Sequence, residues 1–310
     1  MMFQILFHSS YVLNSVIFSF NIWKNNIVPS LLPFFIISEL LINYGFVEFV
    51  GEIFKPIMNL FFKARGVTSF IFIMSIVSGF PSSAKYVREL YLQNIIDENE
   101  ATKLLMFCHF SNPLFILGSV SIMFLNNKEV GVLLLICHYI PNIIIGLLFR
   151  NYYPTSEKLS GIDFKSAILN MHKKRISNDK NFGQIITNSL VNSINTLLLI
   201  LGTVTTFLII TTIIDNNINL SSFYQSILNG LFEMTQGLKY VSILSIPLKI
   251  KCVLSVMIIS FGGFSVHMQV VSIISDTRIK YFPFLFARVI HAFLSAIMMY
   301  FLFDIWINFI

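Results

Sequence analysis

The stretch VTSFIFIMSIVSGFPSSAKYVRELYLQ (residues 67–93) contains two short helical segments separated by the sequence SGFPSS. Proline interrupts a helix, and serine is a favourable residue at the start of the next one. Non-helical backbone at membrane depth is tolerated only where protein or a water-filled cavity surrounds it. The stretch therefore predicts a helical hairpin that enters a membrane and returns. A simple crossing by residues 66–84 is the alternative.

The rest of the chain has the composition of a membrane protein. Of its 310 residues, 55% are hydrophobic and 12% are charged, about half the charged fraction of a soluble domain. Apolar stretches occur along the whole length, which excludes a soluble enzyme with a single anchor. A crossing helix needs ~20 mostly apolar residues. The clear predicted spans are residues 28–47, 104–125, 130–149, 186–214 and 281–303.

A second interrupted tract covers residues 240–275, where FGGF (261–264) separates two apolar segments. Each tract follows a segment with one polar and one apolar helical face, residues 51–65 and 222–234, and such helices lie in the membrane interface. The order of span, surface helix, broken hairpin and span thus occurs twice. Three predicted spans separate the two hairpins, so we expect them to enter from opposite sides, as in the inverted repeats of secondary transporters.

The predicted fold is therefore an all-α polytopic membrane protein, an inverted repeat with two re-entrant helical hairpins and with discontinuous and interfacial helices. We divide it into an N-terminal membrane segment, a first repeat, a basic loop and a second repeat. Their ranges are residues 1–27, 28–150, 151–185 and 186–310.

The basic loop predicts the orientation. Residues 150–183 contain seven lysines and arginines against three acidic residues, and basic loops remain on the cytoplasmic side. We therefore expect residues 151–183 to be cytoplasmic. The first 23 residues carry no charge, so the basic region of a signal peptide is missing, and residues 4–22 predict a weakly apolar first membrane segment.

Candidate site residues gather at the interruptions and at charged positions within apolar tracts. The first interruption offers Gly79, Pro81, Ser82, Ser83, Lys85 and Arg88. The second offers Gly262, Gly263, Ser265 and His267. A proline also breaks the middle of span 104–125, which adds Ser111, Asn112 and Pro113. Glu39, Glu233 and Arg288 complete the set.

The helix that restarts at Ser82 presents the partial positive charge of its N-terminus to the membrane interior. Lys85 and Arg88 follow on about the same face, so we expect a polar or anionic ligand there. In the alternative interpretation, Lys85 pairs with Glu89 four residues later and both side chains reach the membrane surface.

Buried charges in a bilayer must be paired, protonated or exposed to a cavity. Glu39 and Arg288 lie deep in the first and last clear spans, and we expect them to face each other, as a structural pair or as a coupling-ion site. Glu233 is expected to cap or anchor the turn after its surface helix. His267 is either a proton relay or ligand donor, or an ordinary hydrogen-bonded interior residue.

Several kinds of site lack support in the sequence. His138 and His291 have no partners at metal-ligand spacing, and Cys108, Cys137 and Cys252 lie in separate apolar runs, so we expect neither a metal site nor a disulfide framework. Nucleotide-binding and hydrolase motifs are missing, so no cofactor and no enzymatic activity are expected. The net charge of +6 comes without a nucleic-acid recognition motif, and no nucleic acid is expected as a partner.

Five motifs in a fixed order resemble the YlbJ-type sporulation integral membrane proteins, members of the nucleoside-recognition or gate domain group. They are VPSLLPFFIISELLINYGFVEFVG (28–51), SGFPSSAKYVREL (78–90), SNPLFILGSV (111–120), GLFEMTQG (230–237) and FGGFSVHMQVVSI (261–273). The arrangement is similar to the membrane core of concentrative nucleoside transporters and to the gate segments of the ferrous-iron transporter. The resemblance implies an inner-membrane protein of an endospore former, needed for formation of the spore cortex.

Two functions follow as hypotheses. In the first, the interruptions form a midplane site that moves a small polar or anionic solute by alternating access. In the second, the protein is a membrane scaffold that recruits or assembles sporulation proteins through residues 151–183 and its interfacial helices. The lipid bilayer is the expected partner in both, and a homo-oligomer stays open.

Overall fold

The computed structural model describes residues 9–154 and 163–309, and every regular element within them is a helix. Four helical segments in these ranges are long and apolar enough to cross a membrane, and two sharply bent helix pairs raise this number to six. The four segments are Val130–Leu148, Phe182–Asn217, Leu248–Ile274 and Tyr281–Phe309. The prediction of an all-α polytopic membrane protein is confirmed. Residues 4–8 of the predicted first segment lie outside the described ranges.

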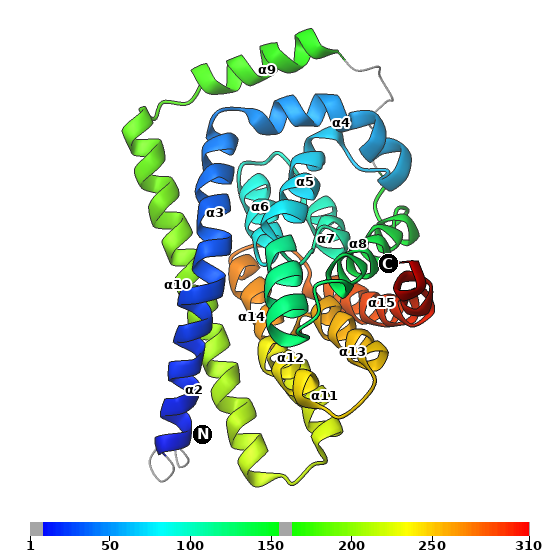
Figure 1. The fold of residues 1–310 in the computed structure, drawn as a ribbon. Coiled ribbons are helices and arrows are strands. Elements are labelled where there is room, and N and C mark those ends of the chain that lie inside the picture. Colours follow the sequence, from blue (N-terminus) through cyan, green and yellow to red (C-terminus); the bar gives the residue numbers. More distant parts are fainter. Residues whose placement is uncertain (1–8, 155–162, 310) are drawn as a thin grey trace.

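The first half of the chain begins with a long bent rod of helices (Figure 1). The rod consists of α2 (Ser9–Ile22), η1 (Trp23–Ile27) and α3 (Val28–Asn43). At its end the chain turns at Gly45, and α4 (Phe46–Phe62) lies across the molecule. The elements that follow are η2 (Gly66–Thr68), α5 (Ser69–Ser78), α6 (Ser82–Leu92), α7 (Glu98–Phe107), the π-helix η3 (Phe115–Phe124) and α8 (Val130–Leu148). α5 and α6 pack side by side as a helical hairpin.

The second half begins with α9 (Phe164–Ile176), which packs on α4, and α10 (Phe182–Asn217), which runs alongside the rod. The remaining helices are α11 (Ser222–Phe232), α12 (Met234–Ile243), α13 (Leu248–Phe261), α14 (Gly263–Ile274) and α15 (Tyr281–Phe309). α11 and α12 pack closely along each other, and α13 packs chiefly along α15.

The hairpin predicted over residues 240–275 is wrong. α13 and α14 meet at Gly262 and together form a single candidate crossing segment, with α13 packed on α15 and α14 packed on α10 and α6. The glycine pair interrupts the helix without reversing it. The reversal in this half occurs earlier, at Glu233, so residues 222–234, predicted as a surface helix, form the first arm of a hairpin with α12.

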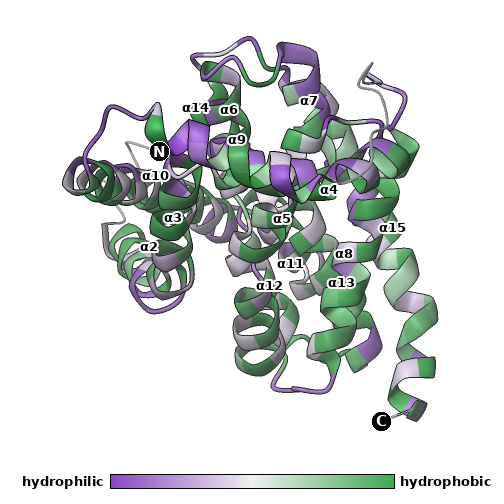
Figure 2. Cartoon of the chain, turned by 90° about the horizontal axis from the view of Figure 1, so that it is seen from above, coloured by the Kyte–Doolittle hydropathy of each residue, from purple (hydrophilic) through white to green (hydrophobic). Residues whose placement is uncertain are grey.

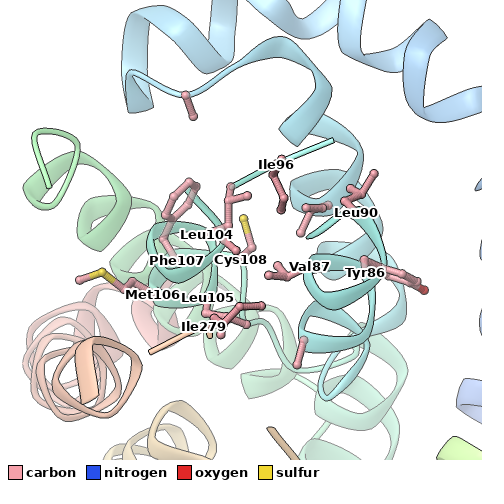
Figure 3. Close-up of a cluster of buried hydrophobic side chains, with 14 of the residues drawn as sticks. Tyr86, Val87, Leu90, Ile96, Leu104, Leu105, Met106, Phe107, Cys108 and Ile279 are labelled. Carbon is pink, nitrogen blue, oxygen red and sulfur yellow. The ribbon is translucent and has the colours of Figure 1, made fainter. Parts of the chain in front are cut away.

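Three apolar clusters hold these helices together. The first contains side chains from α4, α5, α6 and α7 together with α14 and α15. Figure 3 shows its members from α6 and α7. The second joins η3 and α8 to α12, α13 and α15. The third is smaller and joins α3 to α10, through Leu31, Phe35, Leu197, Ile200, Val204 and Leu208. The rod and α10 thus form a group of their own beside the other helices, as Figure 2 shows from above.

Candidate functional site

Interruptions in four helical units converge on one small cavity, which we call the central cavity. Its volume is about 50 Å³. The α5–α6 turn, the α7–η3 break, the α11–α12 turn and the first turns of α14 line it, through Phe80, Ser111, Asn112, Phe115, Glu233, Met234, Thr235, Val266 and Gln269. The rod and α10 complete the lining, through Asn26, Ile27, Leu31, Ile200 and Val204.

The α5–α6 turn and the α7–η3 break are tied together by an asparagine and a glycine. Asn112 Nδ2 donates to the carbonyl of Ser78 at 3.3 Å, and its Oδ1 accepts from the N–H of Leu114 at 2.8 Å, just after Pro113. Gly79 has φ +76° and ψ −176°, and a Cβ added to it would lie 2.4 Å from the backbone nitrogen of Asn112. Only glycine fits this contact.

The residues at the start of α6 support the turn from inside. Pro81 follows a cis peptide bond and precedes the first residue of the helix. The hydroxyl of Ser82 donates to the carbonyl of Gly79, and Ser83 Oγ lies 3.1 Å from His109 Nδ1. The side chains of Pro81, Ser82 and Ser83 are buried and do not line the central cavity. Their role is to fix the shape of the turn.

Arg288 supports the α7–η3 break and is fully buried. Its Nη2 donates to the carbonyl of Met106 at 2.5 Å and to Asn142 Oδ1 at 2.7 Å, while its Nη1 donates to the carbonyl of His109 at 3.1 Å and to His291 Nδ1 at 2.8 Å. The carbonyls at a helix C-terminus lack intrahelical partners and carry partial negative charge. The guanidinium therefore compensates the open end of α7.

His138 and His291, for which the sequence predicts no role, continue this network. His138 Nε2 accepts from the N–H of Ser111 at 2.8 Å, so Nδ1 of the neutral ring donates to Ser260 Oγ at 2.9 Å. Ser260 in turn donates to Ser295 at 2.9 Å, and His291 Nε2 donates to the carbonyl of His138 at 2.7 Å. Ser111 Oγ is buried, lines the central cavity and has no hydrogen-bond partner among the described residues.

Glu233 forms the turn between α11 and α12. Its carboxylate accepts from the N–H of Gln236 at 2.9 Å and from the hydroxyl of Thr235. Glu233 thus caps the N-terminus of α12, as predicted. The two arms touch through glycines, because a Cβ on Gly237 would lie 2.2 Å from Cα of Gly230. Among the described residues that line the central cavity, Glu233 is the one with an acidic or basic side chain.

The α13–α14 break is compensated by a histidine. Gly262 and Gly263 both have positive φ, and Gly263 packs against the backbone of the α11–α12 turn. His267 Nε2 lies 3.0 Å from the carbonyl of Phe261 at the end of α13. Ser265 is buried on the first turn of α14. His267 thus acts here as a hydrogen-bonded interior residue, outside the cavity lining.

The predicted pairing of Glu39 with Arg288 is wrong. Glu39 pairs instead with Lys85, Oε1 to Nζ at 2.7 Å, so the alternative pairing of Lys85 with Glu89 is not the one observed either. Arg88 Nε donates to Asp276 Oδ1 at 2.8 Å, and this hydrogen bond lowers the pKa of that carboxyl, which lies in the loop after α14. Lys85 and Arg88 lie outside the central cavity, in a second cavity described below.

Comparison with known proteins gives the family. A family model described as "Nucleoside recognition" (Gate) matches residues 26–128, the part from the end of η1 to just beyond η3. The sporulation integral membrane protein YlbJ of Bacillus subtilis (strain 168) is 35% identical over 301 residues, covering 89% of this chain and 74% of the relative. No solved structure matches. The fold, with its four to six candidate crossings, agrees with an integral membrane protein. The chain therefore belongs to the family of the sporulation integral membrane protein YlbJ and is a multi-pass membrane protein of sporulation.

Proposed function

We propose that this protein is a carrier that moves a small polar or anionic solute through the central cavity by alternating access. One observation supports the proposal above all: four helices, α6, η3, α12 and α14, begin within about one turn of a residue that lines this cavity. The N-terminus of each carries partial positive charge, and side-chain caps from Asn112 and Glu233 already accept from N–H groups of η3 and α12. Broken helices that meet in this way form the binding sites of secondary transporters.

The proposed fold in the membrane is an inverted repeat with a boundary shifted from the one expected. Hairpin α5–α6, broken helix α7–η3 and span α8 would correspond to hairpin α11–α12, broken helix α13–α14 and span α15. The two hairpins would enter from opposite faces of an inner membrane. The α9 side would be cytoplasmic, because α9 and the loops around it are rich in lysine and arginine.

The lining combines a mainly apolar wall with a few polar groups that could orient a polar solute. Ser111, Asn112, Thr235 and Gln269 supply these groups, and the carboxylate of Glu233 is engaged in capping α12. The family model's description, nucleoside recognition, fits the same class of solute. A volume of about 50 Å³ holds only one or two water molecules. Solute entry would therefore require the hairpins to move away from the rod and α10.

Alternating access can be tested without knowing the solute. We expect a cysteine at Gln269, in a background with the three buried native cysteines replaced, to react with a membrane-impermeant maleimide from both faces of proteoliposomes. Ile297→Cys is the control, because Ile297 is exposed on the apolar helix α15 and should react from neither face. Reaction of the Gln269 variant from one face only would contradict alternating access.

The scaffold remains the second candidate because α9 presents exposed basic and apolar side chains on the surface. Under the carrier proposal, Lys173→Glu combined with Arg175→Glu should leave sporulation within about twofold of the wild type, since surface substitutions cost little stability. The measurement is the count of heat-resistant spores in a Bacillus subtilis strain that lacks its own relative. A loss of spores with unchanged protein level would favour the scaffold.

A further inference from the structure

A second and larger cavity opens between α3, α6, α10 and α14, and we call it the α9-side cavity. Its volume is about 570 Å³. It lies close to the central cavity along α10 and α14: Thr196 is one helical turn from Ile200 on α10, and Ser272 is one turn from Gln269 on α14.

The α9-side cavity contains an unusual group of charges. Glu39, on α3, and Lys85, on α6, are 5% and 13% exposed and form a direct ion pair. Glu89 follows Lys85 by one turn of α6 and lines the same cavity, where it accepts from Gln93 Nε2 at 3.4 Å. It is therefore a second carboxylate close to an ammonium group that is already paired with Glu39. Arg88 is committed to Asp276. Three carboxylates therefore face two basic groups in the lining.

Other basic groups lie farther out. The positive charge of Lys180, just before α10, attracts the carboxylate of Glu89. Lys174 of α9 donates to Gln93 Oε1 at 3.3 Å. Along α10 the lining is uncharged, with Asn192, Asn195 and Thr196. An excess carboxylate in a partly buried site is costly as an anion, and taking up a proton removes that cost.

We propose that the cluster of Glu39, Lys85 and Glu89 binds one exchangeable proton, on Glu89, and thereby controls the contact between hairpin α5–α6 and α3. When Glu89 is protonated, Lys85 pairs with Glu39 alone, and this ion pair connects hairpin α5–α6 to α3 of the rod. When the proton leaves to solvent, the two carboxylates compete for Lys85 and the contact weakens. The proton is a coupling ion only if the carrier function proposed above holds. Proton binding itself does not depend on it.

The experiment uses the full chain in proteoliposomes, with Gln269→Cys as the reporter and the impermeant maleimide added from the α9 side. Between about pH 5.5 and about pH 8, we expect the labelling rate of the reporter to rise at least fivefold. Glu89→Gln, which imitates the protonated state, should fix the rate at its low value. Glu39→Gln, which removes the ion pair, should fix it at its high value. Glu129→Gln, an exposed acid at the start of α8, is the control and should behave like the reporter alone.

These opposite shifts distinguish the proposal from general destabilisation, because each variant removes one carboxylate from the same cluster. A pH dependence that persists in both variants, or that Na⁺ reproduces at constant pH, would overturn it. If the reporter reacts from the α9 side only but still follows pH, the carrier proposal fails and the proton site stands. If it reacts from both faces with no pH dependence, the proton site fails and the carrier stands.

Discussion

Replacing Arg288 with methionine is expected to lower the free energy of unfolding by about 3–5 kcal/mol, because it leaves several buried acceptors without donors. The carbonyls of Met106 and His109 at the end of α7, Asn142 Oδ1 and His291 Nδ1 all accept from this guanidinium. Methionine fills a similar volume and donates nothing. The midpoint of thermal unfolding of the purified protein in detergent measures the effect.

Two further variants test whether the loss of stability comes from the hydrogen bonds of the Arg288 guanidinium. Arg288→Lys retains one charge but cannot reach four acceptors in the planar arrangement of a guanidinium, so we expect an intermediate midpoint. Arg278→Met, in the exposed loop before α15, is the matched control and should stay near the wild type. An Arg288→Met protein as stable as this control would refute the view that Arg288 compensates the open end of α7.

The sequence predicted much of the fold where local chemistry determines it. The Gly79–Pro81 interruption and the break at Asn112 and Pro113 were both recognisable, because glycine and proline stop helices regardless of their surroundings. The spans that became α8, α10 and α15 were equally clear from uninterrupted apolar length. These are the parts in which each residue's own conformational preference decides the outcome.

The second hairpin was misplaced because its turn has no such residue. Glu233 reverses the chain with φ −141° and ψ 114°, an extended conformation open to any residue. What specifies this hairpin is the contact of Gly230 with Gly237 across its two arms, and the GLFEMTQG sequence offers that signal only in retrospect. The sequence at Gly262 and Gly263 suggested a chain reversal. Their positive φ values instead interrupt the helix between α13 and α14, and Gly263 packs against the α11–α12 turn.

The polar contacts of the site were the least predictable part. Arg288 and Glu39 are the natural ion pair when only charges inside apolar spans are counted, but Glu39 pairs with Lys85, and Arg288 donates to two backbone carbonyls and to the side chains of Asn142 and His291. A buried arginine can be stabilised by the open end of a helix without any carboxylate. The sequence does not mark the carbonyl partners, because they are backbone atoms. The His138 and Asn142 pair, one turn apart on α8, was the available hint of a polar face there.

Gly79→Ala is expected to have the largest effect at the site itself. Its φ and ψ of +76° and −176° fall in a region essentially restricted to glycine, where a side chain costs about 1–3 kcal/mol, and the new Cβ would lie 2.4 Å from the backbone of Asn112. Neither side of that contact is a flexible side chain, so the α5–α6 turn and the α7–η3 break must separate. We expect the count of heat-resistant spores in the Bacillus subtilis strain without its own relative to fall at least tenfold.

Gly118→Ala and Gly202→Ala make this prediction specific. Both glycines lie in helices with nothing within 4 Å of an added Cβ, so alanine should be neutral or slightly stabilising there. The comparison separates the loss of a glycine from the loss of one particular contact at the cavity wall. If Gly79→Ala supported sporulation as well as these two variants at equal protein level, the close approach of the two interruptions would be unnecessary for function. The central cavity could then no longer be the working site, because its wall depends on that contact.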